Sequence, residues 1–205
     1  MTRAKVLRFF GVILTLGLTV SVTNPALAYN GGAAASYADS WWNGRNVGAF
    51  PSFSDDCTDF VSQALYSGGE TMSGYPYNIS DSAWWSDAAS SGGYTHSWSI
   101  INDLIQFYAD YSHRGTFGPV SYAPTSGGGT LGLNQGDVLA YDWGQGAGIS
   151  HSSIIVVQNG KDPTYGYTGT LIDQHTYDRY HEIWTLYPTN SLWASTSVSY
   201  VHITN

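Results

Sequence analysis

One cysteine and two histidines in this chain could together support thiol chemistry. Cys57 is the only cysteine, and it lies where the Asp- and Ser-rich run 54–56 changes to an apolar helical pattern. The N-terminus of a helix favours the thiolate, which is the nucleophilic form of cysteine. We therefore predict that Cys57 is a nucleophile. The alternative for a lone cysteine is a small buried hydrophobic residue.

A thiol nucleophile needs a base, and the base needs a group that orients it. His151 opens an apolar, strand-like run directly after the glycine-rich turn 144–148, and it is the predicted base. His175 lies on the next strand-like run and is the predicted third residue. Asp173, two positions earlier on the same strand face, is the alternative third residue. The other histidines are interpreted as surface or half-buried residues: His96, His113, His181 and His202.

No metal or cofactor is expected. The acidic residues around Cys57 (Asp55, Asp56 and Asp59) are interpreted as a solvated helix start. Their negative charge opposes thiolate formation, which makes a cationic histidine partner more necessary. A metal hydrolase built on Cys57, His151 and His175 is disfavoured because these residues form no compact ligand-spacing motif.

The first 28 residues have the pattern of a secretory signal peptide. Three basic residues precede an apolar run over positions 9–20, and Ala26-Leu27-Ala28 supplies the small-x-small cleavage pattern. The apolar run is shorter than the roughly 20 residues that a membrane span needs. We expect cleavage after Ala28 and a secreted product that contacts no membrane.

The remaining residues, 29–205, are expected to form one monomeric domain. Three of the seven basic residues lie in the leader, so this part has four basic and fifteen acidic residues and a net charge of −11. Such an acidic chain has no electrostatic surface for nucleic acid and would be repelled by anionic membranes. Its charge otherwise indicates solubility.

The order of hydrophobic patterns predicts an α+β fold. Helical spacing covers 33–42, a segment from Asp55 or Asp56 to the Gly68-Gly69 pair, and 100–108. Strand patterns cover 137–141, 151–157, 170–176 and 197–203, the first two as a hairpin. Helices followed by strands indicate helices packed on a small antiparallel sheet. The segments 70–99 and 116–132 are predicted as loops, in which Trp84, Trp85 and Trp98 are assigned to packing rather than ligand stacking.

Several segments resemble the putative amidase domain family of exported bacterial proteins. They are Tyr29-Asn30 with 33–42, the run Asp56-Cys57-Thr58-Asp59-Phe60-Val61-Ser62-Gln63 extending to Gly69, residues 97–104, and Ser150-His151-Ser152-Ser153-Ile154. The runs Gly136-Asp137-Val138-Leu139 and Ile149-Ser150-His151 are also similar to the sheet of the NlpC/P60 and CHAP superfamily. This resemblance implies a papain-like domain.

By that resemblance Cys57 is the nucleophile, His151 the general base and acid, and His175 the third residue. The implied function is a secreted cysteine amidase or peptidase, with peptidoglycan peptides as the leading substrate. The alternative is a non-catalytic peptide- or glycan-binding module on the same scaffold. Asp59 stands where the family pattern has Asn, and we interpret this as a surface substitution.

Overall fold

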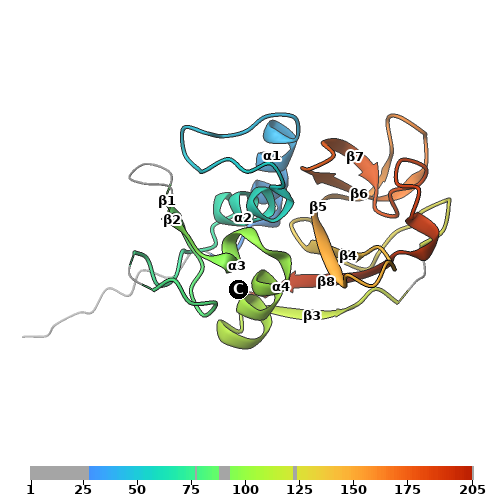
Figure 1. Cartoon of the computed structure of the whole chain (residues 1–205). Coiled ribbons are helices and arrows are strands. Elements are labelled where there is room, and N and C mark those ends of the chain that lie inside the picture. Colours follow the sequence, from blue (N-terminus) through green and yellow to red (C-terminus); the bar gives the residue numbers. More distant parts are fainter. Residues whose placement is uncertain (1–27, 77, 88–92, 122–123, 205) are drawn as a thin grey trace, which may run out of the picture.

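The computed structural model describes residues 28–76, 78–87, 93–121 and 124–204. The predicted signal peptide therefore lies outside the described residues except for Ala28. In the described part, helices from the first half of the chain lie on one side and an antiparallel sheet from the second half on the other (Figure 1). The predicted α+β class is confirmed.

The main sheet has six strands among the described residues, in the order β3-β8-β4-β5-β6-β7, and every neighbouring pair is antiparallel. The strands are β3 (Gly115–Pro119), β4 (Val138–Asp142), β5 (Ile149–Lys161), β6 (Thr168–Gln174), β7 (Arg179–Ile183) and β8 (Ser197–Ile203). Strands β4 and β5 form the predicted hairpin, which places Tyr141 opposite His151. A short second hairpin pairs β1 (Ser86–Asp87) with β2 (Gly93–Tyr94).

Helices α1 (Gly31–Trp41) and α2 (Cys57–Ser67) pack against each other and against β5. The side chain of Asn30 accepts a hydrogen bond from the Ala33 N–H and so caps α1. The buried residues of α1 are all alanines (Ala34, Ala35 and Ala38), and their small size lets α1 lie close to its neighbours. Helix α2 ends at the predicted glycine pair, where Gly69 has a positive φ of 103°.

The predicted helix over 100–108 is wrong as a continuous element. The chain instead forms α3 (His96–Ser99), α4 (Ile101–Gln106) and a π-helical turn at Phe107–Tyr111. Ile100 separates α3 from α4 with an extended backbone, φ −124° and ψ 124°. Its side chain is exposed whereas Trp98 and Ile101 are buried on either side of it. The break therefore coincides with one exposed side chain between two buried ones.

Two edge strands were not predicted. β3 contains Gly115, Gly118 and Pro119, and β7 begins with charged and polar residues, so neither has a strand-like composition. Both form because a neighbouring strand, β8 or β6, offers free backbone groups at the sheet edge. They extend the predicted sheet by one strand at each side.

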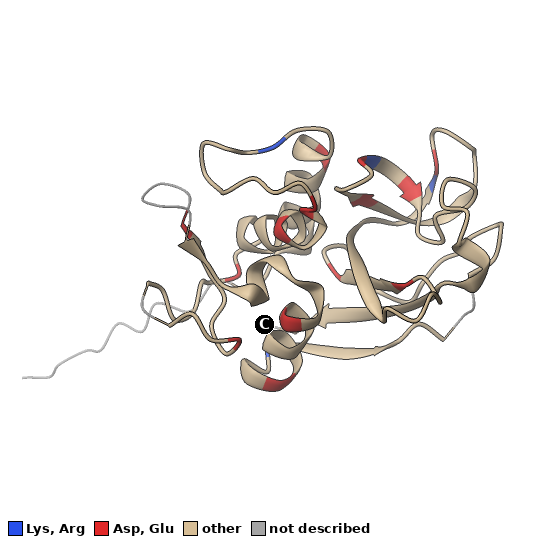
Figure 2. Ribbon diagram, in the orientation of Figure 1, with Lys and Arg blue, Asp and Glu red and all other residues tan. Residues whose placement is uncertain are grey.

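The three tryptophans of the predicted loop 70–99 are core residues. Trp84, Trp85 and Trp98 are 0%, 5% and 0% exposed, and the rings of Trp84 and Trp98 lie 4.7 Å apart. This confirms their packing role and leaves none of them available to stack on a ligand. Acidic residues occur on helices, strands and loops throughout the fold (Figure 2). No helix in the described ranges has the length and hydrophobicity to cross a membrane.

Candidate active site

Cys57 is the first residue of α2, and only 9% of its surface is exposed. The preceding Asp56 is at the N-cap position, but its side chain makes no capping hydrogen bond. Its carboxylate instead binds the Arg45 guanidinium at 2.5 Å and His175 Nδ1 at 2.8 Å. These two contacts fix the start of α2 against the rest of the fold.

The acidic residues around Cys57 are not a solvated helix start, contrary to the prediction. Asp56 and Asp59 are each only 1% exposed, and Asp55 alone is at the surface. Burial of Asp56 is compensated by Arg45, which places a guanidinium charge near the N-terminus of α2. The negative charge that would oppose a thiolate is therefore partly balanced.

His151 lies near the start of β5 and is 4% exposed. Its ring packs beside those of Tyr141 and Trp143, with centroids 5.7 and 5.3 Å away. Its Nε2 is 3.0 Å from Gln174 Oε1. The Gln174 amide group in turn donates to the Tyr177 carbonyl at 3.0 Å. Since the amide nitrogen is used there, its oxygen faces the imidazole and accepts from Nε2–H, which leaves Nδ1 free to take a proton.

The structure brings Cys57 and His151 together. Burial acts to raise the pKa of the thiol, but its hydrogen bond and charge interaction with His151 oppose burial, and the net pKa falls from 9.0 to about 7. A hydrogen bond from the Ser152 backbone and one from the Thr58 hydroxyl act in the same direction. A cysteine with this pKa is substantially thiolate at neutral pH.

The structure places His175 away from His151. Its Nδ1 contacts Asp56 Oδ2 and its Nε2 contacts the Trp41 carbonyl, each at 2.8 Å. The His175 ring also stacks on Phe60 with centroids 3.9 Å apart. Both ring nitrogens are engaged, so His175 joins α1, α2 and β6 instead of orienting the base.

Asp173, the alternative third residue, does not contact His151 either. Its Oδ1 accepts the backbone N–H of His181 at 2.7 Å on the β7 side. The residue that orients His151 is Gln174, which lies between the two predicted candidates. The side chains of Asp173 and His175 make their contacts elsewhere, with the His181 backbone and with Asp56 and Trp41. The sequence reasoning missed Gln174 because it considered only ionisable residues, although an amide oxygen also accepts from imidazole.

Asp59 is not a surface substitution, which corrects the prediction. Its Oδ1 accepts the indole N–H of Trp98, and its Oδ2 accepts an amide N–H of Gln63, both at 2.6 Å. Burial raises its pKa from 3.8 to about 7. Asp59 therefore connects α2 to α3 within the core.

Two backbone N–H groups at the start of α2 share one hydroxyl acceptor. Those of Asp56 and Cys57 donate to Thr176 Oγ1, at 3.1 and 3.2 Å. Thr176 lies in the β6–β7 turn with a positive φ of 70°, which is unfavourable for a β-branched residue. The turn thus holds a hydroxyl where the helix would otherwise offer free donors to an anion.

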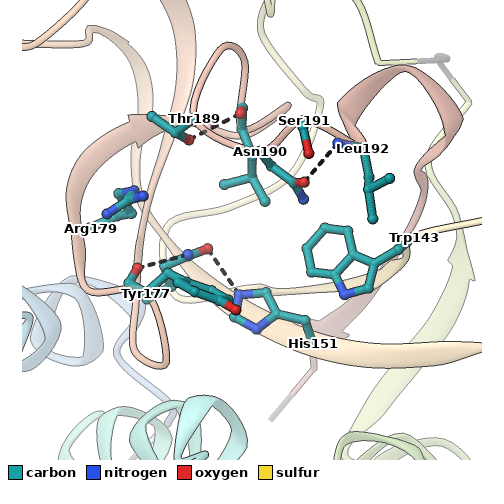
Figure 3. A pocket seen from close by; sticks show the side chains of 10 residues that line it. Trp143, His151, Tyr177, Arg179, Thr189, Asn190, Ser191 and Leu192 are labelled. Carbon is teal, nitrogen blue, oxygen red and sulfur yellow. Dashed lines mark hydrogen bonds between the residues drawn. The ribbon is translucent and has the colours of Figure 1, made fainter.

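A pocket of about 400 Å³ lies beside His151. His151 and Trp143 lie at one side of it, and the loop that carries Thr189–Leu192 lies opposite (Figure 3). Gln174, Tyr177, Arg179 and Leu186 complete its lining. Cys57 does not line this pocket, so His151 is the group shared between the thiol and the cavity.

The disfavoured metal hydrolase on Cys57, His151 and His175 has no geometric support. Two groups of metal-ligating side chains lie close together in the described residues, and neither contains any of these three. One group is Asp39, Asp173 and His181, and the other is Asp81, His96 and Asp103.

Comparison with known proteins supports the resemblance at the family level. The model of the family described as "Putative amidase domain" matches residues 28–200. The chain is also 29% identical over 179 residues to the Uncharacterized protein YhbB of Bacillus subtilis (strain 168), an alignment that covers 87% of this chain and 51% of that protein. The chain therefore spans about half the length of this curated relative. No solved structure matches the chain.

Proposed function

The chain belongs to the putative amidase domain family, and from this premise we propose that it is a secreted cysteine amidase or peptidase with a papain-like fold. The family description indicates amide hydrolysis in general terms. The proposal assigns the reaction to Cys57 as nucleophile and His151 as general base and acid. It replaces His175 by Gln174 as the residue that orients His151.

The observation that carries this proposal is the arrangement around His151. One ring nitrogen is held by Gln174, and the imidazole lowers the pKa of the Cys57 thiol to about 7 against the effect of burial. Nucleophilic catalysis requires a nucleophile that contacts a base and a further group that orients this base. The thiol also lies at the N-terminus of α2, where the helix dipole favours its negative charge.

The reaction follows from this arrangement. The Cys57 thiolate attacks the amide carbonyl carbon, and the carbonyl oxygen becomes a tetrahedral oxyanion. The His151 imidazolium gives its proton to the leaving nitrogen as the C–N bond breaks, which leaves a thioester on Cys57. His151 then takes a proton from water, and the resulting attack releases a carboxylate and returns the thiol.

The oxyanion needs donors near the start of α2. Because the N–H of Cys57 donates to Thr176 Oγ1, a substrate oxygen that binds this N–H would replace the hydroxyl. The unfavourable φ of Thr176 lowers the cost of such a displacement, because a released turn is free to relax. Binding of substrate and movement of the β6–β7 turn are therefore coupled in this proposal.

Peptides derived from peptidoglycan are the proposed substrate, and secretion by the N-terminal leader would bring the protein to them. The net charge of −11 beyond the leader disfavours tight binding to anionic wall polymers and favours soluble fragments. The test is a digest of purified peptidoglycan and soluble muropeptides with the wild-type protein and Cys57→Ser, read by mass spectrometry. New amine and carboxylate ends are expected only with the wild type. Identical digests on both substrates would reject wall peptides as the substrate.

A non-catalytic binding module is the second candidate, because the backbone N–H groups of Asp56 and Cys57 are occupied by Thr176. The pocket beside Trp143 could bind a peptide or glycan without chemistry. Both the wild type and Cys57→Ser would then bind the same muropeptides, detected by calorimetry, and neither would change their mass. Turnover by the wild type alone excludes this candidate.

A further inference from the structure

Three metal-ligating side chains from distant parts of the sequence meet beside β6. Asp39 comes from α1, Asp173 from β6 and His181 from β7, and one ligand atom of each lies within 4.8 Å of the others. Asp173 is completely buried, whereas the side chains of Asp39 and His181 are 40% and 21% exposed. The group therefore has one buried ligand, Asp173, and two ligands that are open to solvent.

Asp173 has an oxygen for which the fold supplies no donor. Its Oδ1 accepts the His181 backbone N–H, but its buried Oδ2 has no hydrogen-bond partner among the described residues. The Asp39 carboxylate is close enough for the two acids to share a hydrogen bond when one is protonated. Two facing carboxylates of this kind need a proton or a cation between them.

His181 supplies the third ligand type. Its Nε2 lies 2.8 Å from Asp39 Oδ1, and its ring stacks on Tyr180 with centroids 3.9 Å apart. The same residue donates its backbone N–H to Asp173, so its position depends on both acids. These contacts hold the imidazole where it can bind a cation together with the two carboxylates.

We propose that Asp39, Asp173 and His181 form a binding site for one divalent transition-metal ion of the zinc class. Imidazole and carboxylate ligands suit Zn²⁺, which commonly takes three protein ligands and leaves a position for water. Calcium and magnesium prefer more oxygen ligands than this group offers. A bound cation neutralises the facing carboxylates and satisfies Asp173 Oδ2.

Such an ion would connect α1 to β6 and β7. Asp173 directly precedes Gln174, and α1 ends at Trp41, whose carbonyl contacts His175. The site therefore stabilises β6, whose Gln174 contacts the predicted base, without taking part in thiol chemistry. This assignment does not depend on the proposed amidase reaction.

The second group of acids and histidine provides a matched control. Asp81, His96 and Asp103 have the same residue types and similar spacing, but none of them is buried. None of their side-chain atoms is a buried oxygen or nitrogen without a partner. The same types of ligand are thus present, but without a buried oxygen that lacks a hydrogen-bond partner.

The test is a calorimetric titration of chelator-treated protein with Zn²⁺, carried out on Cys57→Ser so that the thiol cannot capture the metal. One site is expected, together with a rise in Tm of about 5–10 °C at a zinc concentration 100 times the Kd. Adding Asp39→Asn is expected to weaken binding at least tenfold, because this exposed residue supplies a ligand. Adding Asp103→Asn is expected to leave the affinity within about twofold.

A second variant separates loss of the site from loss of the fold. Asn at position 173 can donate its amide N–H to Asp39, so Asp173→Asn is expected to fold and yet to lose zinc binding. Absence of zinc binding in Cys57→Ser overturns the proposal. The Asp39 and Asp173 carboxyl groups would then share a proton instead of a metal ion. Binding that survives Asp39→Asn, is lost in Asp103→Asn, or is exceeded by binding of Ca²⁺ in the same titration overturns it as well.

Discussion

Replacement of His151 by alanine is expected to raise the pKa of the Cys57 thiol from about 7 toward its ordinary value of 9.0. His151 is the main group that lowers this pKa, whereas burial alone raises it above the ordinary value of 9.0. At pH 7 a thiol with a pKa near 7 is about half ionised, and one with a pKa of 9 is about 1% ionised. The thiolate population at pH 7 should therefore fall about 50-fold.

The assay is labelling of the purified protein with iodoacetamide between pH 5 and 10, followed by mass spectrometry. Because Cys57 is the only cysteine and is largely buried, the midpoint of the pH profile is compared rather than the absolute rate. His96→Ala is the matched control, since this histidine is exposed, and its profile should equal that of the wild type. A wild-type midpoint near 9, or one that His151→Ala leaves unchanged, would refute the assigned pairing of thiol and imidazole.

Three further outcomes are expected. In Gln174→Ala, kcat/KM on an established substrate should fall roughly 10- to 150-fold from the lost hydrogen bond to the imidazolium, and an unchanged value would contradict its orienting role. Thr176→Val should lose about 1–3 kcal/mol of unfolding free energy, because two N–H groups lose their acceptor. Thr176→Ser keeps the hydroxyl and should lose much less. Urea titrations measure both variants, and equal losses would contradict the hydrogen bonds. A raised pKa at Asp59 means that the folded state holds a proton that the unfolded state releases, so stability is lost as pH rises from about 4 to about 7. Asp59→Asn should therefore gain stability relative to wild type over that interval, by up to about 4 kcal/mol, and a difference independent of pH would count against it.

The elements that support the site could be predicted from local patterns. The apolar spacing that follows Cys57 and the glycine pair at its end located α2, and the apolar run after His151 located β5. These signals are local, because helix and strand periods repeat within a few residues. The edge strands β3 and β7 have no such period and form through pairing with β8 and β6, which is a non-local cause.

The third residue and the buried acids could not be predicted in this way. On β6 the choice among Asp173, Gln174 and His175 depends on which face of the strand turns toward His151, and a shift of one residue reverses every side chain. The pairing of β6 with β7 is itself irregular between Ile172 and Gln174, so alternation alone does not decide the faces. Burial of Asp59 likewise depends on Trp98, which lies 39 residues later in the chain.

The sequence by itself determined that the chain has one thiol, that this thiol begins a helix, and that a histidine lies near the start of a strand of a later sheet. It could do so because residue type and short-range spacing are sufficient to define such elements. Only the tertiary structure decided what surrounds them. It places Gln174 rather than His175 against the His151 imidazole, and the Thr176 hydroxyl against the backbone N–H of Cys57. It also places Asp39 beside Asp173. Each of these contacts joins segments more than twenty residues apart, and only the packing of α1 and α2 on the sheet brings them within hydrogen-bonding distance.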